Sequence, residues 1–404
     1  MSLVYEKWII ESLGGNSEKA GIEAEQMRKL RRVLHRAYSQ SVYYKDSFSG
    51  LNIDSLHSLA DLPSLSFITG QDVKNNSMRM LCVPLADVER IATIQTSGTT
   101  GISKRIYFTQ HDLARTVDFF STGMIDVLNG AGSCMIFMSG TTENSIARLL
   151  QMGLAKAKIS AEIHGNIKDE HEAYLSARGF ECYVGIPGEM LCLCRTYPNL
   201  RPKSVLLSAD YIPKSLASSI ESTWKCPVFY HYGMTETCYG FAVQCSDREG
   251  MHIRSGEFIV EIIDPDSGAQ LPPGSDGEIV ISTLENEALP LIRYRTGDIG
   301  RLETSPCGCL AKLPSLAVVR GRRDNLKNKI NIHMLDELVY AFPTVKNYTA
   351  SISACGVHLI FDLMESAPMP DLKELSHALG CEVTASQERL GPFLSRGKRQ
   401  LEFL

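Results

Sequence analysis

The sequence predicts an α/β protein with a large N-terminal body, a β subdomain and a small C-terminal α/β domain. First, its 404 residues exceed what one ordinary hydrophobic core organises, so two or three domains are expected. Second, apolar strands alternate with helical stretches through the first half of the chain, which is typical of a sheet covered by helices. Third, from about residue 256 short β-branched strands alternate with Pro and Gly turns, before an α/β pattern returns near the end.

The individual elements follow in order along the chain. Residues 23–39 carry an apolar face at helical spacing with arginines opposite, which predicts a packed amphipathic helix. A turn-rich connector at 61–72 leads to a short helix, and Thr109 with Asp112 caps a longer one. Residues 256–284 predict an antiparallel β region, and 318–329 an exposed basic joint. Strands of the first half are expected at 90–94, 105–109, 132–140, 180–187 and 204–210.

The composition is that of an ordinary globular protein, with 44% hydrophobic residues, 22% charged residues and a net charge of −5. This balance disfavours nucleic acid as a partner, because nucleic-acid binders are usually basic. No apolar run is long enough to span a bilayer, so no membrane partner is expected. The N-terminal stretch has no small-residue cleavage site and is interpreted as mature sequence. The 12 cysteines therefore predict thiols or metal ligands in a reducing cytoplasm, rather than disulfides.

A run of glycines and hydroxyls, TSGTTGISK, follows the strand at 90–94. Glycines let backbone amides approach an oxyanion closely, hydroxyls add donors without bulk, and Lys104 offers a cation. The spacing differs from the Walker pattern, so the run predicts a phosphate site outside the ordinary P-loop NTPases. The alternative is a flexible turn that is rich in Thr and Gly. The loop residues are Ser97, Gly98, Thr99, Thr100 and Gly101.

Three later stretches extend this pattern. YHYGMTET places Tyr232 and Glu236 after an apolar strand, RYRTGDIG places Asp298 after a Thr-Gly turn, and RGRRDNLK lies in the basic joint. In this order and with these gaps, the chain resembles the adenylate-forming enzymes, which include acyl-CoA synthetases, adenylation domains and luciferases. SADYIP and EALPLIRYRTGD make it most similar to the phenylacetate–CoA ligase branch, from about residue 25 to the end.

The resemblance implies an AMP-binding domain at 1–321 and a small mobile lid domain at 322–404, with a hinge at Asp324 and ATP between the domains. It implies that Thr235 contacts the α-phosphate, that Glu236 holds Mg²⁺, and that Asp298 accepts both ribose hydroxyls. By position in the motifs, the nucleotide is expected to contact the loop and Lys104, together with Ser208, Ala209, Asp210, Tyr232, Gly233, Met234, Thr235, Asp298 and Arg322.

The implied reaction is an attack of a carboxylate on the α-phosphorus of ATP, in which Mg²⁺ and cations offset the charge. Lys398, in LSRGKRQ, is implied as the catalytic lysine beside Thr235 and Glu236; the alternative is a solvated lysine of the tail. The lid then rotates and a thiol, usually that of coenzyme A, attacks the acyl-adenylate. A modest aromatic or branched acid is expected, because the implied acyl pocket is small and mainly apolar. Its residues are Met138, Ser139, Ile186, Pro187 and Gly188.

Four residues form a second constellation. Cys245 and His252 are separated by six residues, and Cys307 and Cys309 form a Cys-x-Cys pair in a polar turn. Three thiolates and one imidazole make a closed tetrahedral zinc set. Members of the resembled branch often carry a Cys/His cluster in these places, so a structural zinc ion is expected; the alternative is four unrelated residues. Other cysteines, such as those at 192 and 194, lie in an apolar helical stretch and are expected in the core.

The segment after the hinge, DNLKNKINIH, departs from the family pattern. It is shorter by about two residues and lacks the usual glycine, so that Lys329 or Ile330 stands where a side chain could block the pantetheine arm. The acceptor therefore stays open between coenzyme A, a carrier-protein thiol and an amine. A catalytically weakened sensor of acyl groups or nucleotides is the alternative from another class. The oligomeric state is also open, with a homodimer as one option.

Overall fold

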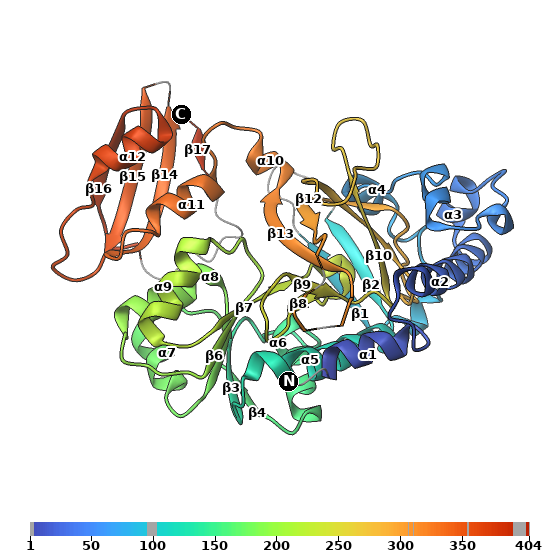
Figure 1. Cartoon of the computed structure of the whole chain (residues 1–404), viewed down its shortest axis with the longest axis horizontal. Coiled ribbons are helices and arrows are strands. Elements are labelled where there is room, and N and C mark those ends of the chain that lie inside the picture. The colour runs from blue at the N-terminus through green and yellow to red at the C-terminus, as the bar shows by residue number, and fades with distance from the viewer. Residues whose placement is uncertain are drawn as a thin grey trace. The chain divides into compact units, whose positions relative to one another are not determined.

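The structure, a computed structural model, describes residues 4–94, 103–305, 307–309, 311–353, 355–390 and 401–403. The chain forms two compact units, each built from two segments. The first unit combines Met1–Asp126 with Tyr232–Val319, and the second combines Val127–His231 with Arg320–Leu404. Both units contain helices and strands (Figure 1), so the predicted α/β class is confirmed.

The helices of the first unit follow the predicted pattern closely. The long N-terminal helix buries Met27, Leu30 and Leu34 on one face, as the apolar spacing predicts. The predicted cap is also present, because Thr109 N donates to Asp112 Oδ2 at 2.9 Å and Asp112 N donates to Thr109 Oγ1 at 3.2 Å. The helices are α1 (Val4–Ser12), α2 (Lys19–Gln40), α3 (Val42–Ser47), α4 (Gly70–Asn76) and most of α5 (Gln110–Leu128).

The strands of the first unit are mainly antiparallel. A hairpin of β1 (Arg90–Ile94) and β2 (Lys104–Phe108) flanks the predicted phosphate loop. A larger set runs in the spatial order β10-β11-β12-β13-β9-β8, and the antiparallel β10–β11 pair confirms the predicted β region. These strands are β8 (Ala242–Gln244), β9 (Met251–Ile253), β10 (Phe258–Ile263), β11 (Gly277–Thr283), β12 (Tyr294–Leu302) and β13 (Ser315–Arg322). β13 extends through 318–322, so this part of the predicted joint is strand; Arg320 is exposed and the other four residues are half-buried.

The second unit holds a parallel sheet in the order β7-β6-β5-β3-β4. Its central strands are buried along their length, as expected when helices cover both faces. The strands are β3 (Ser133–Phe137), β4 (Ser160–Ile163), β5 (Cys182–Gly185), β6 (Ser204–Leu207) and β7 (Val228–Tyr232). The helices are α6 (Ile146–Lys156), α7 (Glu170–Ala177), α8 (Pro187–Thr196) and α9 (Lys214–Trp224). Cys192 and Cys194 are buried in α8, which confirms their predicted place in the core.

The C-terminal segment of the second unit forms the small α/β part that the sequence predicts. Its sheet has the order β16-β15-β14-β17, with β14 (Val345–Ser353), β15 (Gly356–Leu363), β16 (Val383–Gln387) and β17 (Glu402–Phe403). Its helices are α10 (Arg323–Leu326), α11 (Ile332–Val339) and α12 (Leu372–Leu379). Leu335 and Val339 of α11 belong to the same hydrophobic cluster as Leu193 of α8 and Ile220 of α9. The boundary at 321/322 and the mobility of a lid stay predictions.

Candidate nucleotide and metal sites

Two predicted site residues from distant parts of the chain meet in one buried ion pair. Lys104 begins β2, and Glu236 lies in the helical turn Thr235–Thr237 after β7. Their side chains form a salt bridge and are only 11% and 5% exposed. The hydroxyl of Tyr294, the first residue of β12, donates to Glu236 Oε1 at 2.9 Å and accepts from Lys104 Nζ at 3.3 Å. The three side chains therefore form one polar group inside the first unit.

The ionisation of Glu236 depends on these partners. Burial on its own raises the pKa of this carboxyl, but the charge and hydrogen bond of Lys104, with a hydrogen bond from Tyr294, lower it below the ordinary glutamate value. The side chain is therefore an ionised oxygen donor. Carboxylate oxygen is the protein ligand that Mg²⁺ prefers, so the donor fits the predicted metal.

A second contact joins two further predicted residues. The Tyr232 hydroxyl, at the end of β7, donates to Asp298 Oδ2 at 2.7 Å. Asp298 is buried on β12, where its backbone amide donates to Thr296 Oγ1 at 3.0 Å. The intervening Gly297 has φ of +75°, a backbone conformation that favours glycine, so the predicted Thr-Gly turn is an irregularity within strand β12. The structure therefore brings the residues predicted beside the base and the ribose into direct contact.

The turn that carries Glu236 is strained and supported from behind. Cys238 and Tyr239, which directly follow this helical turn, both have a left-handed backbone, with φ of 52° and 69°. Non-glycine residues in this region each cost about 1–3 kcal/mol and persist where the surroundings hold them. Thr116 Oγ1 donates to the carbonyl oxygen of Cys238 at 2.8 Å, and Arg254 donates to that of Gly240 at 2.9 Å.

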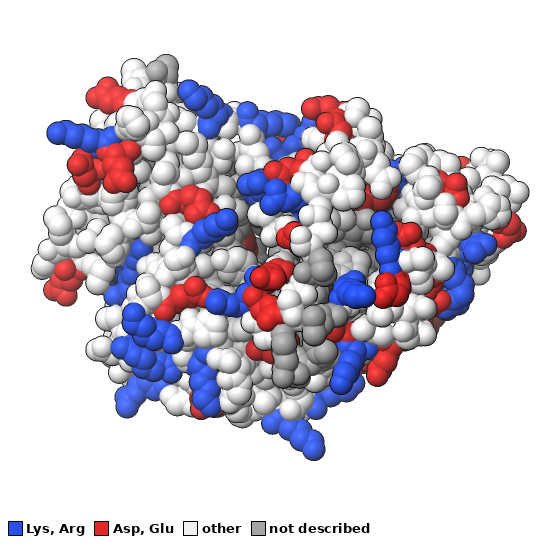
Figure 2. Space-filling view, in the orientation of Figure 1, with Lys and Arg blue, Asp and Glu red and all other residues white. Residues whose placement is uncertain are grey.

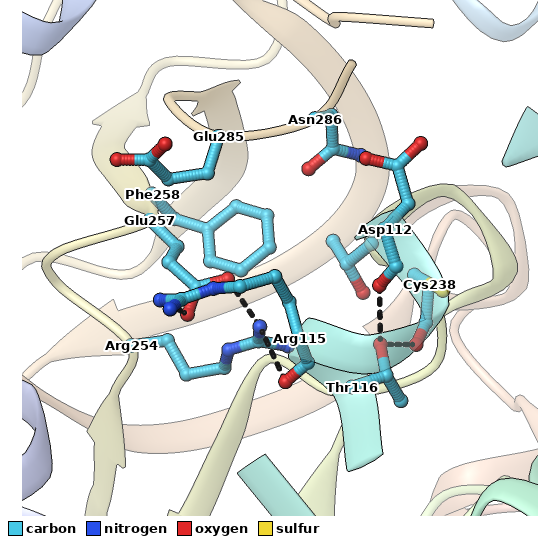
Figure 3. Close-up of a pocket in the computed structure, with 10 residues that line it drawn as sticks. Asp112, Arg115, Thr116, Cys238, Arg254, Glu257, Phe258, Glu285 and Asn286 are labelled. Carbon is cyan, nitrogen blue, oxygen red and sulfur yellow. Dashed lines mark hydrogen bonds and ion pairs between the residues drawn. The ribbon is translucent and has the colours of Figure 1, made fainter. Parts of the chain in front are cut away.

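Figure 3 shows these supporting side chains around a cavity of about 10 Å³. A volume of this size holds about one water molecule. Arg115 and Arg254 both pair with Glu257 there, so the cationic groups already have a carboxylate partner. The polar residues around the cavity therefore support the turn, and the cavity itself is too small for a substrate.

In the second unit, parallel strands bring the remaining predicted binding residues to one edge. Phe137 lies beside Gly185, Gly185 beside Leu207, and Leu207 beside Tyr230. The residues that follow these four positions are therefore neighbours at the carboxyl ends of the strands, where α/β proteins bind ligands. They are Met138 and Ser139, Ile186 with Pro187 and Gly188, Ser208 with Ala209 and Asp210, and His231.

The polar groups at this edge are already ordered by the protein. Ser208 Oγ and His231 Nδ1 lie 2.7 Å apart and both residues are buried. Ala209 has φ of 71°, and the Asp210 carboxylate accepts from the amide of Tyr211 at 2.8 Å. Because Ser208 is held by His231, its hydroxyl has a fixed position beside the predicted acyl and adenine residues.

The predicted hinge residues lie at the start of the C-terminal segment. Arg322 ends β13 and directly precedes α10, which contains Asp324. The carboxylate of Asp324 is exposed and pairs with Lys327 Nζ at 2.6 Å, and this hydrogen bond lowers the pKa of Asp324. The side chain of Lys329 is exposed. The roles of these residues in ribose binding and hinge motion stay predictions.

The four predicted zinc ligands lie together in the first unit. The ligand atoms of Cys245, His252, Cys307 and Cys309 all lie within 4.8 Å of one another, and all four residues are buried. The shortest contacts are 3.2 Å between His252 Nε2 and Cys309 Sγ and 3.5 Å between the sulfurs of Cys245 and Cys307. Burial raises the pKa of Cys309 to about 12 and lowers that of His252 to about 4, so the imidazole is neutral. A Cys₃His set of this kind fits a structural zinc ion.

The N-terminal helix α1 packs against this cluster. The Tyr5 hydroxyl donates to the carbonyl oxygen of His252 at 3.1 Å. Glu6 Oε1 lies 3.7 Å from His252 Nε2, and the side chain is 1% exposed. Among the described residues, neither carboxylate oxygen of Glu6 has a hydrogen-bond partner. The sequence pattern does not single out this residue, because it lies more than two hundred positions from the nearest cysteine of the cluster.

Figure 2 shows basic and acidic side chains interspersed over the visible side. A surface groove of about 430 Å³ in the first unit includes Asp87, Glu89 and Glu287 in its lining, a charge that would repel a polyphosphate. No helix in the part of the chain that the structure describes combines the length and apolarity needed to cross a membrane.

Several predicted residues fall outside the described part of the chain. These are Ser97, Gly98, Thr99, Thr100, Gly101 and Lys398, whose roles stay predictions. Conversely, motif reasoning missed Tyr294 and His231, although both lie inside the quoted motifs. Their place inside these motifs was the only signal in the sequence that could have found them. Without it, a tyrosine in a strand or a buried histidine is usually an ordinary core residue.

A profile of the family described as AMP-binding enzyme matches residues 58–285. The phenylacetate-coenzyme A ligase of Thermus thermophilus is 23% identical over 406 residues, which cover 94% of this chain and 89% of the relative. The phenylacetate-coenzyme A ligase of Pseudomonas putida is 27% identical, over 76% of this chain and 73% of the relative. The resemblance that the motifs predict is therefore confirmed.

Solved structures agree with the fold. The crystal structure of 2-hydroxyisobutyryl-CoA ligase in the postadenylation state, in complex with R3-HIB-AMP, aligns with a TM-score of 0.81. The alignment covers 95% of this chain and 90% of that chain at 16% sequence identity. At this identity the likeness establishes the fold, which is that of an adenylate-forming enzyme.

Proposed function

The chain belongs to the AMP-binding enzyme family, and from this premise we propose that it uses ATP to convert a small carboxylic acid into an acyl-adenylate, which coenzyme A then attacks. The observation that carries the proposal is the pairing inside the first unit. Lys104 contacts Glu236, and Tyr232 contacts Asp298. These four residues are the ones that the motifs assign to a single metal-bound nucleotide.

In the first step, a carboxylate oxygen of the acid bonds to the α-phosphorus of ATP, and the bond to pyrophosphate breaks. Asp298 accepts the ribose hydroxyls, and the phosphate loop with Lys104 holds the departing pyrophosphate. Glu236 would hold Mg²⁺, which as a Lewis acid offsets the charge on the phosphate oxygens. Thr235 contacts the α-phosphate, and Lys398 adds a cation to the developing charge.

In the second step, the thiol of coenzyme A attacks the acyl carbon and AMP leaves. The shortened segment near Lys329 and Ile330 keeps a carrier-protein thiol or an amine as the second candidate acceptor. We place the reaction in the cytoplasm. This is supported by the cysteines, because none of the 12, all of which the structure describes, is in a disulfide.

The acid is proposed to be a small aromatic or branched one. The edge that holds Met138, Ile186 and Ser208 supports this size because it is tightly packed: a Cβ at the neighbouring Gly185 would lie 2.6 Å from Met190 Sδ and 3.3 Å from Phe137 Cβ. The curated relatives are named for phenylacetate, and the aligned structure is that of a 2-hydroxyisobutyryl-CoA ligase in complex with R3-HIB-AMP. We further propose that Cys245, His252, Cys307 and Cys309 hold a structural zinc ion that ties the β8–β9 hairpin to the turn before β13.

Exchange of labelled pyrophosphate into ATP tests the first step. We expect exchange with phenylacetate or a small branched acid and none without an acid, and Glu236→Gln should abolish it. Release of AMP on adding coenzyme A then tests the second step. Exchange without coenzyme A-dependent AMP release would favour a different acceptor, and nucleotide binding without exchange for any acid would favour a sensor.

A further inference from the structure

We propose that Tyr294 is a positioning residue for the metal-binding carboxylate. Its hydroxyl occupies Oε1 of Glu236 and thereby leaves Oε2 for the Mg²⁺ ion of the nucleotide. The inference rests on the proposed function, since it assumes that Glu236 holds that ion. It deepens the proposed function by giving a role to a residue that the motif assignments leave without one.

The contacts of Glu236 divide its two oxygens. Both described side chains that reach this carboxylate, Lys104 and Tyr294, contact Oε1. Neither of these two side chains engages Oε2 of Glu236. The hydrogen bond at Oε1 fixes the rotation of the carboxylate and so directs Oε2, the oxygen at which a hard cation would bind.

Tyr294 is better suited than Lys104 to hold Glu236 while a nucleotide is bound. The ammonium of Lys104 is attracted to phosphate oxygens, so a bound triphosphate competes with Glu236 for it. The hydroxyl of Tyr294 is neutral and donates to the carboxylate at 2.9 Å, and a triphosphate does not draw it away by charge. When Lys104 turns to the phosphates, the tyrosine hydrogen bond therefore remains.

The backbone around Tyr294 is held on both sides. Ile68 N donates to the carbonyl oxygen of Arg293 at 3.1 Å, and Arg295 N donates to that of Ile68 at 2.8 Å. The ring is buried, and a Cβ at Gly70 would lie 3.6 Å from the Tyr294 hydroxyl oxygen. A hydroxyl that is fixed by a sheet and by the start of α4 can orient a carboxylate, since it does not itself move.

The test compares Tyr294→Phe with a matched control, Tyr44→Phe. Tyr44 is a buried tyrosine of the same unit whose hydroxyl donates to the carbonyl oxygen of Pro290 rather than to Glu236. Binding of Mn²⁺, as a probe for Mg²⁺, is measured by electron paramagnetic resonance with a non-hydrolysable ATP analogue. We expect Tyr294→Phe to weaken Mn²⁺ binding about tenfold, as for loss of a hydrogen bond to a charged group, and Tyr44→Phe to leave it unchanged.

The same comparison in a Lys104→Met background shows whether Tyr294 acts on Glu236 or only accepts a hydrogen bond from Lys104. If Tyr294 acts on Glu236 directly, Tyr294→Phe still weakens Mn²⁺ binding when Lys104 is absent. Unchanged Mn²⁺ binding in Tyr294→Phe, with the same loss of melting temperature as in Tyr44→Phe, would overturn the proposal. If the wild-type protein binds the Mn²⁺ nucleotide but none of the acids tested supports pyrophosphate exchange, the proposed reaction is wrong. The role of Tyr294 in metal binding would not be affected by that result.

Discussion

At the scale of single residues, the ion pair of Lys104 and Glu236 makes stability depend on pH in a definite direction. The folded-state pKa of Glu236 lies below its ordinary value, so the pair stabilises the fold above that value and loses its effect as the pH falls through the folded pKa. Lys104→Met removes the cation and leaves a buried carboxyl whose pKa burial raises. We therefore expect a loss of about 3 kcal/mol at pH 7, as for breaking a buried pair, and a smaller loss towards pH 4.

Thermal unfolding of the wild type and of Lys104→Met at pH values between 4 and 7 measures the difference in their unfolding free energies. This range of ~3 pH units spans the titration of an ordinary glutamate. The control is Arg301→Met, whose guanidinium lies 3.9 Å from the half-exposed Asp276 and contributes little. A difference between wild type and Lys104→Met that stays constant over this range would show that Glu236 does not titrate through the pair.

Asp298 allows a test of nucleotide recognition at one side chain. Asp298→Asn keeps the shape and an oxygen for the Tyr232 hydroxyl, but removes the charge that strengthens hydrogen bonds from the ribose hydroxyls. We expect the KM for ATP in pyrophosphate exchange to rise about tenfold to a hundredfold, with little change in melting temperature. Asp276→Asn, also in the first unit, is the control. A rise in the KM for the acid instead of that for ATP would contradict the assignment.

How far the sequence predicts the site also differs from residue to residue. Lys104, Glu236 and Asp298 were predictable because they sit at fixed places in motifs, and the structure joins Lys104 to Glu236 and Asp298 to Tyr232, another residue of these motifs. Tyr294 and Glu6 were not, because their importance comes from long-range neighbours. Nothing in the local pattern of α1 shows that Glu6 lies beside His252.

At the scale of elements, helix α5 supports the turn that presents Glu236. Thr116→Val removes the hydroxyl that donates to the carbonyl oxygen of Cys238, at nearly constant volume. The buried carbonyl oxygen of Cys238, in the strained turn, then loses a hydrogen-bond donor. We therefore expect a loss of about 1–2 kcal/mol in unfolding free energy. We also expect a higher Mg²⁺ concentration for half-maximal exchange. Thr116→Ser keeps the hydroxyl and is the control; equal effects of the two variants would assign the loss to packing.

The cysteine cluster ties the β8–β9 hairpin to the turn before β13. Cys309→Ser removes one of the four proposed ligands, the sulfur that lies 3.2 Å from His252 Nε2. We expect about one equivalent of zinc in the wild type by mass spectrometry and a large loss of metal in the variant, with a lower melting temperature, because metal binding adds to folding stability. Cys192→Ser, in the core of α8, is the control that should keep its zinc. Metal-free wild-type protein of full stability would rule out the zinc site.

Elements that depend on local pattern were predicted well, and the strand that runs into the predicted joint was not. The hairpin strand β1 has the predicted bounds, and the Thr109–Asp112 cap is formed. By contrast, nothing in the sequence predicted that the exposed and half-buried residues 318–322 continue β13, whose first residues pair with β9, as in the pair Ser315 and His252. The pairing of this strand depends on a partner more than sixty residues away. The local sequence therefore shows only its basic residues, which are more typical of an exposed loop than of a strand.

At the scale of the whole molecule, the second unit is assembled from two segments that are distant in sequence. The link is partly apolar, through the shared cluster of α8, α9 and α11, and partly polar. The Arg195 guanidinium donates to the carbonyl oxygens of Tyr340, at 2.8 Å, and of Val345. Glu337 accepts from the Tyr211 hydroxyl at 2.9 Å. The sequence predicted a small C-terminal α/β part but could not show these contacts, because they join residues more than a hundred positions apart.

Arg195 gives the sharpest test of this link. Its side chain belongs to a residue that is 5% exposed, and burial lowers its pKa only to about 10, so it stays charged at neutral pH. Arg195→Met keeps the apolar stem but leaves two buried carbonyl oxygens without this donor, at an expected loss of about 3 kcal/mol. Because the lost contacts lie at the ends of α11 and the start of β14, we expect faster amide exchange there than in β5 and β6.

Hydrogen exchange with mass spectrometry measures this difference, with Arg201→Met as the control, because Arg201 donates to the carbonyl oxygens of Pro198 and Leu200 within its own loop. If 322–404 is a lid that rotates between the two steps, as the family resemblance implies, these contacts must break once in each cycle. Arg195→Met should then also change the rate of AMP release with coenzyme A more than the rate of pyrophosphate exchange. Equal effects on both rates, with unchanged exchange in β14, would show that the second unit acts as one rigid body.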